Sequence, residues 1–173
     1  MLLRGVSLDL GPGDALHLTG RNGNGKSSLL RIPAGLARPF AGRVAATGMV
    51  ALADERLPLD AHRPLGAALD FWRRIDRSAA AIAAFALDDL AQVPVRFLST
   101  GQKKRAGLAM IAAQGAPIWL LDEPLNGLDR DWRARIAEQV AAHRAQGGIV
   151  VIASHLAPGL ADCAELPLER FVP

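Results

Sequence analysis

The chain has no tyrosine and only one cysteine, Cys163, among its 173 residues. A single thiol excludes an internal disulfide framework and a cysteine-rich zinc site. The longest uncharged run, residues 106–121, is short for a bilayer span and is interrupted by Gln114 and Pro117. The first residues also lack the layout of a signal peptide. We therefore expect a cytosolic protein whose membrane role, if it has one, depends on a partner.

The overall balance of residues indicates one ordinary globular domain over residues 1–173. Half of the residues are hydrophobic, which excludes a disordered chain, and the length is sufficient to bury a core. The net charge of +3 is too small to favour a nucleic-acid or membrane surface as the partner.

Hydrophobic patterns predict alternating strands and helices. Strands are expected at residues 2–10, 15–19, 42–46, 48–53, 118–121 and 149–153. A helix should begin at Lys26 and kink or end early at Pro33, because an interior proline costs about 3 kcal/mol. Residues 57–95 look mainly helical. We expect an α/β fold with a mainly parallel sheet, a small antiparallel part beginning with residues 2–10, and an inserted helical subdomain at about 57–95.

A glycine-rich loop follows the strand at residues 15–19. It fits the Walker A pattern G-x-x-x-x-G-K-[ST] through Gly20, Arg21, Asn22, Gly23, Asn24, Gly25, Lys26 and Ser27, with Ser28 after it. Glycines let the backbone wrap around phosphate oxygens, Lys26 would reach the β- and γ-phosphates, and Ser27 would ligate Mg²⁺. The alternative is a glycine- and asparagine-rich turn before a helix.

Two carboxylates, Asp122 and Glu123, end the apolar strand that begins at Ile118. Ligands of parallel α/β sheets bind at such strand ends. Asp122 would hold Mg²⁺ through water, and Glu123 would act as general base on the attacking water. The alternative is that they form a turn and cap the next helix.

The segment Leu98–Gln102 should open a helix with the N–H groups of Ser99, Gly101 and Gln102 directed at an anion. Basic residues 103–105 follow in the first turn, where the helix dipole disfavours cations. This mismatch favours a nearby anion or acidic partner, although a solvated basic face remains an alternative.

The order of these motifs resembles that of ATP-binding cassette (ABC) ATPases. Within that class, residues 18–31, 34–39, 69–72 and 116–124 make the chain most similar to the haem exporter ATP-binding subunit of cytochrome c maturation. The resemblance implies a P-loop NTPase fold, ATP and Mg²⁺ as cofactors, and Mg²⁺-dependent ATPase activity.

The resemblance also implies further site residues. Ser99, Gly101 and Gln102 would act across a dimer of two ATPase subunits, and Asp129 would belong to the loop that links the two sites. His155 would be the switch histidine that contacts the γ-phosphate. Glu55 stands at the position where the family has a glutamine that couples to the membrane partner.

The implied role is that of an ATP-hydrolysing subunit in haem export or delivery, on the cytoplasmic face of the inner membrane. Its partners would be an integral membrane permease subunit and a second copy of itself, with no nucleic acid and no direct haem binding. The absent C-x-x-C-H motif agrees with the last point. Alternatives are another small ABC transporter, a soluble non-transport ABC ATPase, and a regulatory module without turnover.

One departure from the family concerns the strand that carries an adenine-stacking aromatic residue. The chain has no tyrosine and begins close to Gly20, so we expect this N-terminal strand to be incomplete or truncated and adenine selectivity to be weak.

Overall fold

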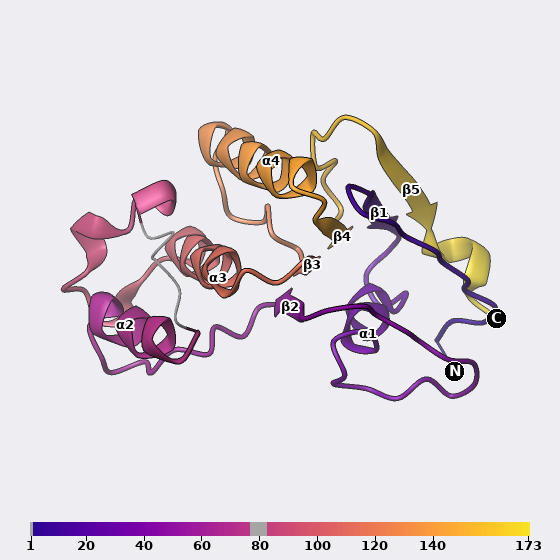
Figure 1. Cartoon of the computed structure of the whole chain (residues 1–173), viewed down its shortest axis with the longest axis horizontal. Helices are drawn as coiled ribbons and strands as arrows, with labels where there is room; N and C mark the ends of the chain where they lie inside the picture. The colour runs from indigo at the N-terminus through magenta and orange to yellow at the C-terminus, as the bar shows by residue number, and fades with distance from the viewer. Residues whose placement is uncertain (1, 77–82) are drawn as a thin grey trace. The chain divides into compact units, whose positions relative to one another are not determined.

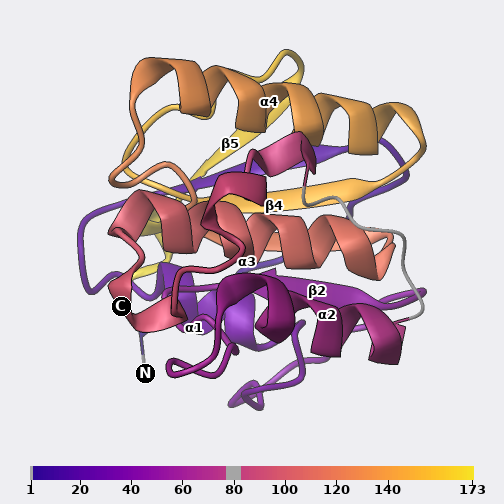
Figure 2. The same ribbon diagram turned by 90° about the vertical axis from the view of Figure 1, so that its left-hand side faces the viewer.

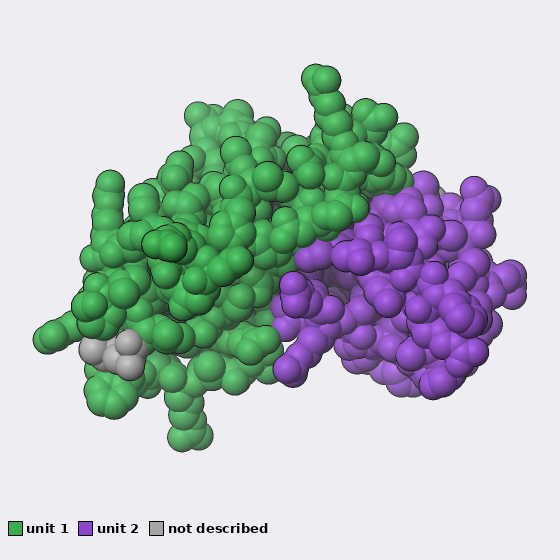
Figure 3. Space-filling model, turned by 180° about the vertical axis from the view of Figure 1, so that it is seen from behind, with its two compact units in different colours: residues 1–52, 116–173 green, residues 53–115 purple. Residues whose placement is uncertain are grey.

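The computed structural model describes residues 2–76 and 83–173 in two compact units (Figure 3). The first unit comprises residues 1–52 and 116–173, and the second comprises residues 53–115. The helical insertion expected at about 57–95 falls within the second unit, and residues 77–82 of it lie outside the described residues.

A five-stranded sheet in the order β2-β3-β4-β1-β5 organises the first unit (Figure 1). Its strands are β1 (Ala15–Thr19), β2 (Val50–Ala53), β3 (Ile118–Asp122), β4 (Ile149–Ala153) and β5 (Cys163–Pro167). The pairings of β4 with β1 and β3, and of β1 with β5, are parallel. The expected α/β fold with a parallel sheet is therefore confirmed.

The two faces of this sheet are covered by α1 (Lys26–Arg31) and α4 (Arg130–Ala145), which lie on opposite sides (Figures 1 and 2). Burial of the central strands on both faces explains their continuous apolar sequences. A core cluster joins α1 to the sheet and consists of Leu16, Leu18, Leu30, Leu120, Val151, Ala153 and Leu168. Ile136 and Val140 are the buried residues of α4.

Pro33 ends the helix that follows the glycine loop, as the sequence predicts. The α-helix stops at Arg31, and turns continue to Leu36 through bonds such as Ala34 N–H to Leu30 O. Proline has no N–H to donate to the ladder, and its ring clashes with the preceding turn. The short α1 thus follows directly from one residue.

The small antiparallel part that was expected to begin with residues 2–10 is not formed there, and a second expected strand at residues 42–46 is absent from the described structure. Residues 2–10 make no strand: Gly5 bends the segment with a φ of 74°, and Leu3 and Leu10 pack on the core without a neighbouring ladder. Residues 42–46 are exposed and also form no strand. A period-two pattern shows which residues are apolar, but a strand requires a partner for its N–H and C=O groups.

β5 is a strand that the sequence analysis did not predict. It is short, ends in Pro167 and pairs with β1 at the sheet edge. Proline is tolerated at such an edge because one side of the strand needs no ladder partner.

The second unit consists of α2 (Leu65–Asp76), α3 (Thr100–Gln114) and 3₁₀ turns at Ala83–Phe85, Asp88–Leu90 and Val95–Phe97. Leu65 and Leu69 are buried, whereas Phe71 and Ile75 on the same helix are exposed. Close approach of the Ala91 carbonyl explains Gly66, since a Cβ there would lie 3.2 Å from that oxygen. No helix in the described ranges is both long and apolar enough to cross a membrane.

Candidate functional site

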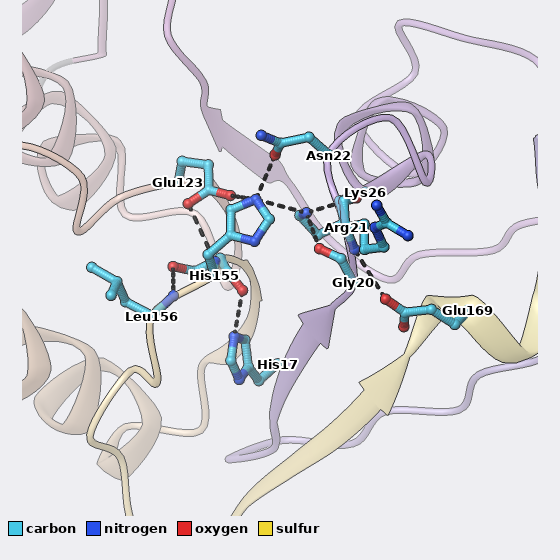
Figure 4. Close-up of polar contacts among 10 residues, drawn as sticks. His17, Gly20, Arg21, Asn22, Lys26, Glu123, His155, Leu156 and Glu169 are labelled. Atoms are coloured by element: carbon cyan, nitrogen blue, oxygen red, sulfur yellow. Dashed lines mark hydrogen bonds and ion pairs between the residues drawn. The ribbon is translucent and has the colours of Figure 1, made fainter.

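Three adjacent strands bring the predicted site residues of the first unit to one edge of the sheet. The glycine loop follows β1, His155 follows β4, and Asp122 and Glu123 lie at the end of β3. Because β3, β4 and β1 are parallel neighbours, their carboxyl ends share this edge. Figure 4 shows Lys26, Glu123 and His155 meeting there.

The glycine loop has the backbone conformation that its sequence requires. Gly20, Gly23 and Gly25 have backbone φ values of 143°, 85° and 88°, which residues other than glycine rarely adopt. Lys26 is only 6% exposed, and its ammonium donates to the carbonyls of Gly20 at 2.6 Å and Arg21 at 3.3 Å. The loop therefore folds around the Lys26 ammonium, which can then offer its positive charge to an anion.

Asp122 is the last residue of β3, and Glu123 begins the turn that follows it. Asp122 is 8% exposed, and the Glu123 side chain is 14% exposed. Glu123 has a φ of 47°, a conformation that costs a non-glycine residue about 1–3 kcal/mol and is concentrated at functional sites. Its N–H donates to the Ala153 carbonyl at 2.7 Å. This bond fixes the turn beside the end of β4, where His155 lies.

His155 connects the loop to the carboxylate. Its Nε2 lies 3.3 Å from Lys26 Nζ, 3.5 Å from Glu123 Oε1 and 2.5 Å from Asn22 Oδ1 (Figure 4). Its backbone N–H donates to Glu123 Oε2 at 3.4 Å. Residues from three separate motifs are thus within contact distance, which is the arrangement needed to bind a phosphate and orient a water next to it.

His17 supports this arrangement, although the sequence analysis assigned it no function. It is buried on β1, and its Nε2 lies 2.9 Å from the carbonyl oxygen of Ser154, the residue before His155. Ser154 is fully buried, and its hydroxyl accepts the Leu156 N–H at 3.0 Å. These contacts hold the turn that presents His155. Nothing in the local sequence distinguishes His17 from a core histidine.

Glu169 is a second residue that sequence reasoning missed. It lies in a 3₁₀ turn at the end of the chain and accepts the N–H of Arg21 in the glycine loop at 3.0 Å (Figure 4).

Asp129 caps α4. Its Oδ1 accepts the Trp132 N–H at 2.9 Å. This contact places Asp129 at the start of the helix but does not test its predicted part in a dimer.

The predicted signature residues lie in the second unit, where Ser99 caps α3. Ser99 Oγ accepts the Gln102 N–H at 3.2 Å, while Gln102 Oε1 accepts the Ser99 N–H at 2.8 Å. This reciprocal capping box was readable from the S-x-x-Q spacing. Two of the N–H groups expected to face an anion are therefore engaged within the helix end itself, and Gly101 lies between them.

Two other residues singled out in the sequence, Arg105 and Glu55, also lie in the second unit. Arg105 donates to the carbonyls of Phe85 and Ala86 at 3.2 Å each, so it holds a neighbouring 3₁₀ turn. This contact gives one member of the basic triplet a structural role and weakens the argument from helix-dipole mismatch. Glu55 is exposed in a turn in which Asp54 accepts the Arg56 N–H.

The donor set fits a phosphate better than a permanent metal site. Among the described residues, no three His, Cys, Asp or Glu side chains form a cluster that could hold a metal ion. Mg²⁺ normally keeps several waters and uses one or two protein ligands plus substrate phosphates. The predicted pair, Ser27 and Asp122, suits that mode.

Comparison with known proteins agrees with this geometry. The family described as ABC transporter matches residues 3–126. The cytochrome c biogenesis ATP-binding export protein CcmA of Novosphingobium aromaticivorans is 58% identical over 173 residues, which is 100% of this chain and 91% of that protein.

Solved structures share the fold at low identity. A putative ABC transporter ATP-binding protein from Pyrococcus furiosus has a TM-score of 0.81 at 19% identity, covering 99% of this chain and 92% of that one. A dimeric ATP-binding cassette bound to ADP and phosphate has a TM-score of 0.75 at 22% identity, covering 90% and 80%. With the family match and the full-length relative, these findings show that the chain belongs to the ABC transporter family, as one of its cytochrome c biogenesis ATP-binding export proteins.

Proposed function

We propose that this chain binds Mg²⁺ and ATP and hydrolyses ATP as the energy-supplying subunit of a membrane complex that delivers haem for cytochrome c maturation. One observation carries the ATPase assignment. Lys26, His155 and Glu123 come from three different motifs, and His155 Nε2 lies 3.3 Å from Lys26 Nζ and 3.5 Å from Glu123 Oε1. A purely structural glycine turn would not require a buried lysine and a strained glutamate at the same place.

In this mechanism the loop N–H groups and Lys26 bind the β- and γ-phosphates. Ser27 and Asp122 would hold Mg²⁺, which would supply positive charge to offset the negative charge of the phosphates. Glu123 accepts a proton from the attacking water, while His155 orients the γ-phosphate beside it. The side-chain oxygen of Asn22 contacts the His155 ring, and the backbone N–H of His155 donates to Glu123 Oε2. These contacts hold the side chains of His155 and Glu123 next to each other.

The active form is a symmetric pair of chains in which each signature completes the other chain's site. Ser99 would supply its hydroxyl donor and Gly101 its N–H to the γ-phosphate, while Gln102 would hold this helix end through the capping box. Asp129 would link the two sites. The capping box supports this proposal because it presents the Ser99 end of α3 in a fixed conformation. The dimeric state of one structural neighbour is consistent with such a pair.

The haem assignment rests on the relatives of this chain, which are cytochrome c biogenesis ATP-binding export proteins. We infer a position at the cytoplasmic face of the cell membrane, bound to an integral membrane permease. Exposed Glu55 is our candidate contact with that permease. Haem itself would be handled by the membrane partners.

Lys26→Ala tests the proposal. The purified variant should lose binding of a fluorescent ATP analogue, because the loop loses the charge closest to the phosphates. Cells carrying it should contain haem but lack mature c-type cytochromes. Arg133→Ala is the matched control, since it removes one exposed positive charge from α4. Normal c-type cytochromes with Lys26→Ala would refute the haem role, and retained ATP binding would refute the site.

A further inference from the structure

The peptide group that joins Gly20 to Arg21 is held from both sides. Its carbonyl accepts a hydrogen bond from Lys26 Nζ at 2.6 Å. Its N–H donates to Glu169 Oε1 at 3.0 Å. Figure 4 shows Glu169 and Lys26 on either side of this peptide.

The geometry of a peptide bond couples these two contacts. A trans peptide is planar, and its C=O and N–H point in opposite directions. A side chain that fixes the direction of the Arg21 N–H therefore also fixes the direction of the Gly20 carbonyl. Gly20 allows this contact because a Cβ there would lie 3.2 Å from Glu169 Oε1, in addition to the strain of its φ of 143°.

Packing of the chain's last turn places Glu169 at the loop. The preceding residue, Leu168, is fully buried in the core cluster beside Leu18 and Leu30. The parallel register pairs Thr19 with Pro167, so the 3₁₀ turn after β5 begins level with the end of β1. The carboxylate thus approaches the loop from a rigid part of the structure.

We propose that Glu169 is a positioning residue for the phosphate-binding lysine and acts through the Gly20–Arg21 peptide. The inference rests on the proposed ATP site and adds a residue outside the three motifs. An ammonium group has three donors, so Lys26 can keep its bond to the Gly20 carbonyl and still reach phosphate oxygens. The carbonyl therefore orients the lysine for binding and does not withdraw it from the nucleotide.

The experiment compares Glu169→Ala and the length-matched Glu169→Met, which lack an acceptor oxygen, with Glu169→Gln, which retains one. The control is Glu165→Ala, because Glu165 is an exposed carboxylate on β5 that accepts from the Thr19 hydroxyl and not from the loop backbone. The dissociation constant for Mg-ATP is measured by fluorescence, with kcat at saturating ATP. Hydrogen exchange of the Arg21 amide is measured without nucleotide.

Glu169→Ala and Glu169→Met should raise the dissociation constant about three- to tenfold, the loss expected for one hydrogen bond at an exposed site. The value of kcat should stay within about twofold, since the catalytic groups are untouched. The Arg21 amide should exchange faster in both variants, while Glu169→Gln and Glu165→Ala should behave like the wild type.

Unchanged or tighter ATP binding in Glu169→Ala and Glu169→Met would overturn the inference. So would an equal loss in Glu165→Ala, which would indicate a general effect of charge. If the wild type fails to bind ATP, the proposed function is refuted. The hydrogen-exchange rate of the Arg21 amide then still decides whether Glu169 holds the loop, because that measurement needs no nucleotide.

Discussion

Replacing Glu123 by glutamine should separate ATP binding from ATP hydrolysis. The amide keeps the shape of the carboxylate and an oxygen that can accept the His155 N–H, which now lies 3.4 Å from Glu123 Oε2. It cannot accept a proton from water at neutral pH. The substitution therefore removes the proposed base and leaves the surrounding turn in place.

The size of the effect follows from these contacts. Loss of one well-placed catalytic group lowers turnover by roughly 10²–10³, equivalent to about 2.7–4 kcal/mol of transition-state stabilisation. ATP binding should stay the same or become tighter, because a negative charge is removed close to the phosphate site. The structural cost should be small, since glutamine has the same branching as glutamate at the position with a φ of 47°.

A coupled phosphate-release assay at saturating Mg-ATP measures turnover, and a fluorescent ATP analogue measures binding. Glu138→Gln is the control, because it makes the same chemical change at an exposed position of α4. Turnover of Glu123→Gln within threefold of the wild type would show that Glu123 is not the general base.

Three further predictions follow from the structure. Ser99→Arg, made in the Glu123→Gln background, should abolish ATP-driven dimerisation in size-exclusion chromatography while the monomer still binds nucleotide; dimers of undiminished stability would place the signature away from the interface. Gly148→Ala should lower the free energy of unfolding by roughly 1–3 kcal/mol in urea titrations, because its Cβ would overlap the His143 ring, which stacks on Trp119 at 3.9 Å. Burial lowers the pKa of His143 in the folded chain, so the unfolded chain takes up its proton first and stability should fall as the pH drops below about 6.5. His143→Phe should flatten this pH dependence, and an equal slope in both proteins would contradict the assignment.

Several features of the fold were predictable because their causes are local. Pro33 ends α1 through its own missing N–H. The helix after Leu98 begins at Thr100 with Ser99 as its cap, and the glycine loop takes φ values open chiefly to glycine. Buried parallel strands such as Ile118–Asp122 are recognisable from continuous apolar sequence.

The segments that were wrongly predicted depend on partners elsewhere in the chain. The alternating residues 2–10 look like a strand but lie along the core without one, whereas Cys163–Pro167 looks unlike a strand and becomes one beside β1. Strand formation requires a neighbouring row of backbone donors and acceptors. Such a partner cannot be read from the segment itself.

By itself, the sequence determined the chemistry available to this protein: a phosphate-binding loop, a carboxylate pair after a buried strand, and a capped helix at the signature. Only the tertiary structure decided which groups act together. His155 meets Asn22 across 133 positions of sequence, and Glu169 meets Arg21 across 148. The physical reason is that motifs are set by local dihedral and hydrogen-bonding preferences, whereas the pairing order of the strands decides which strand ends lie together at one edge of the sheet.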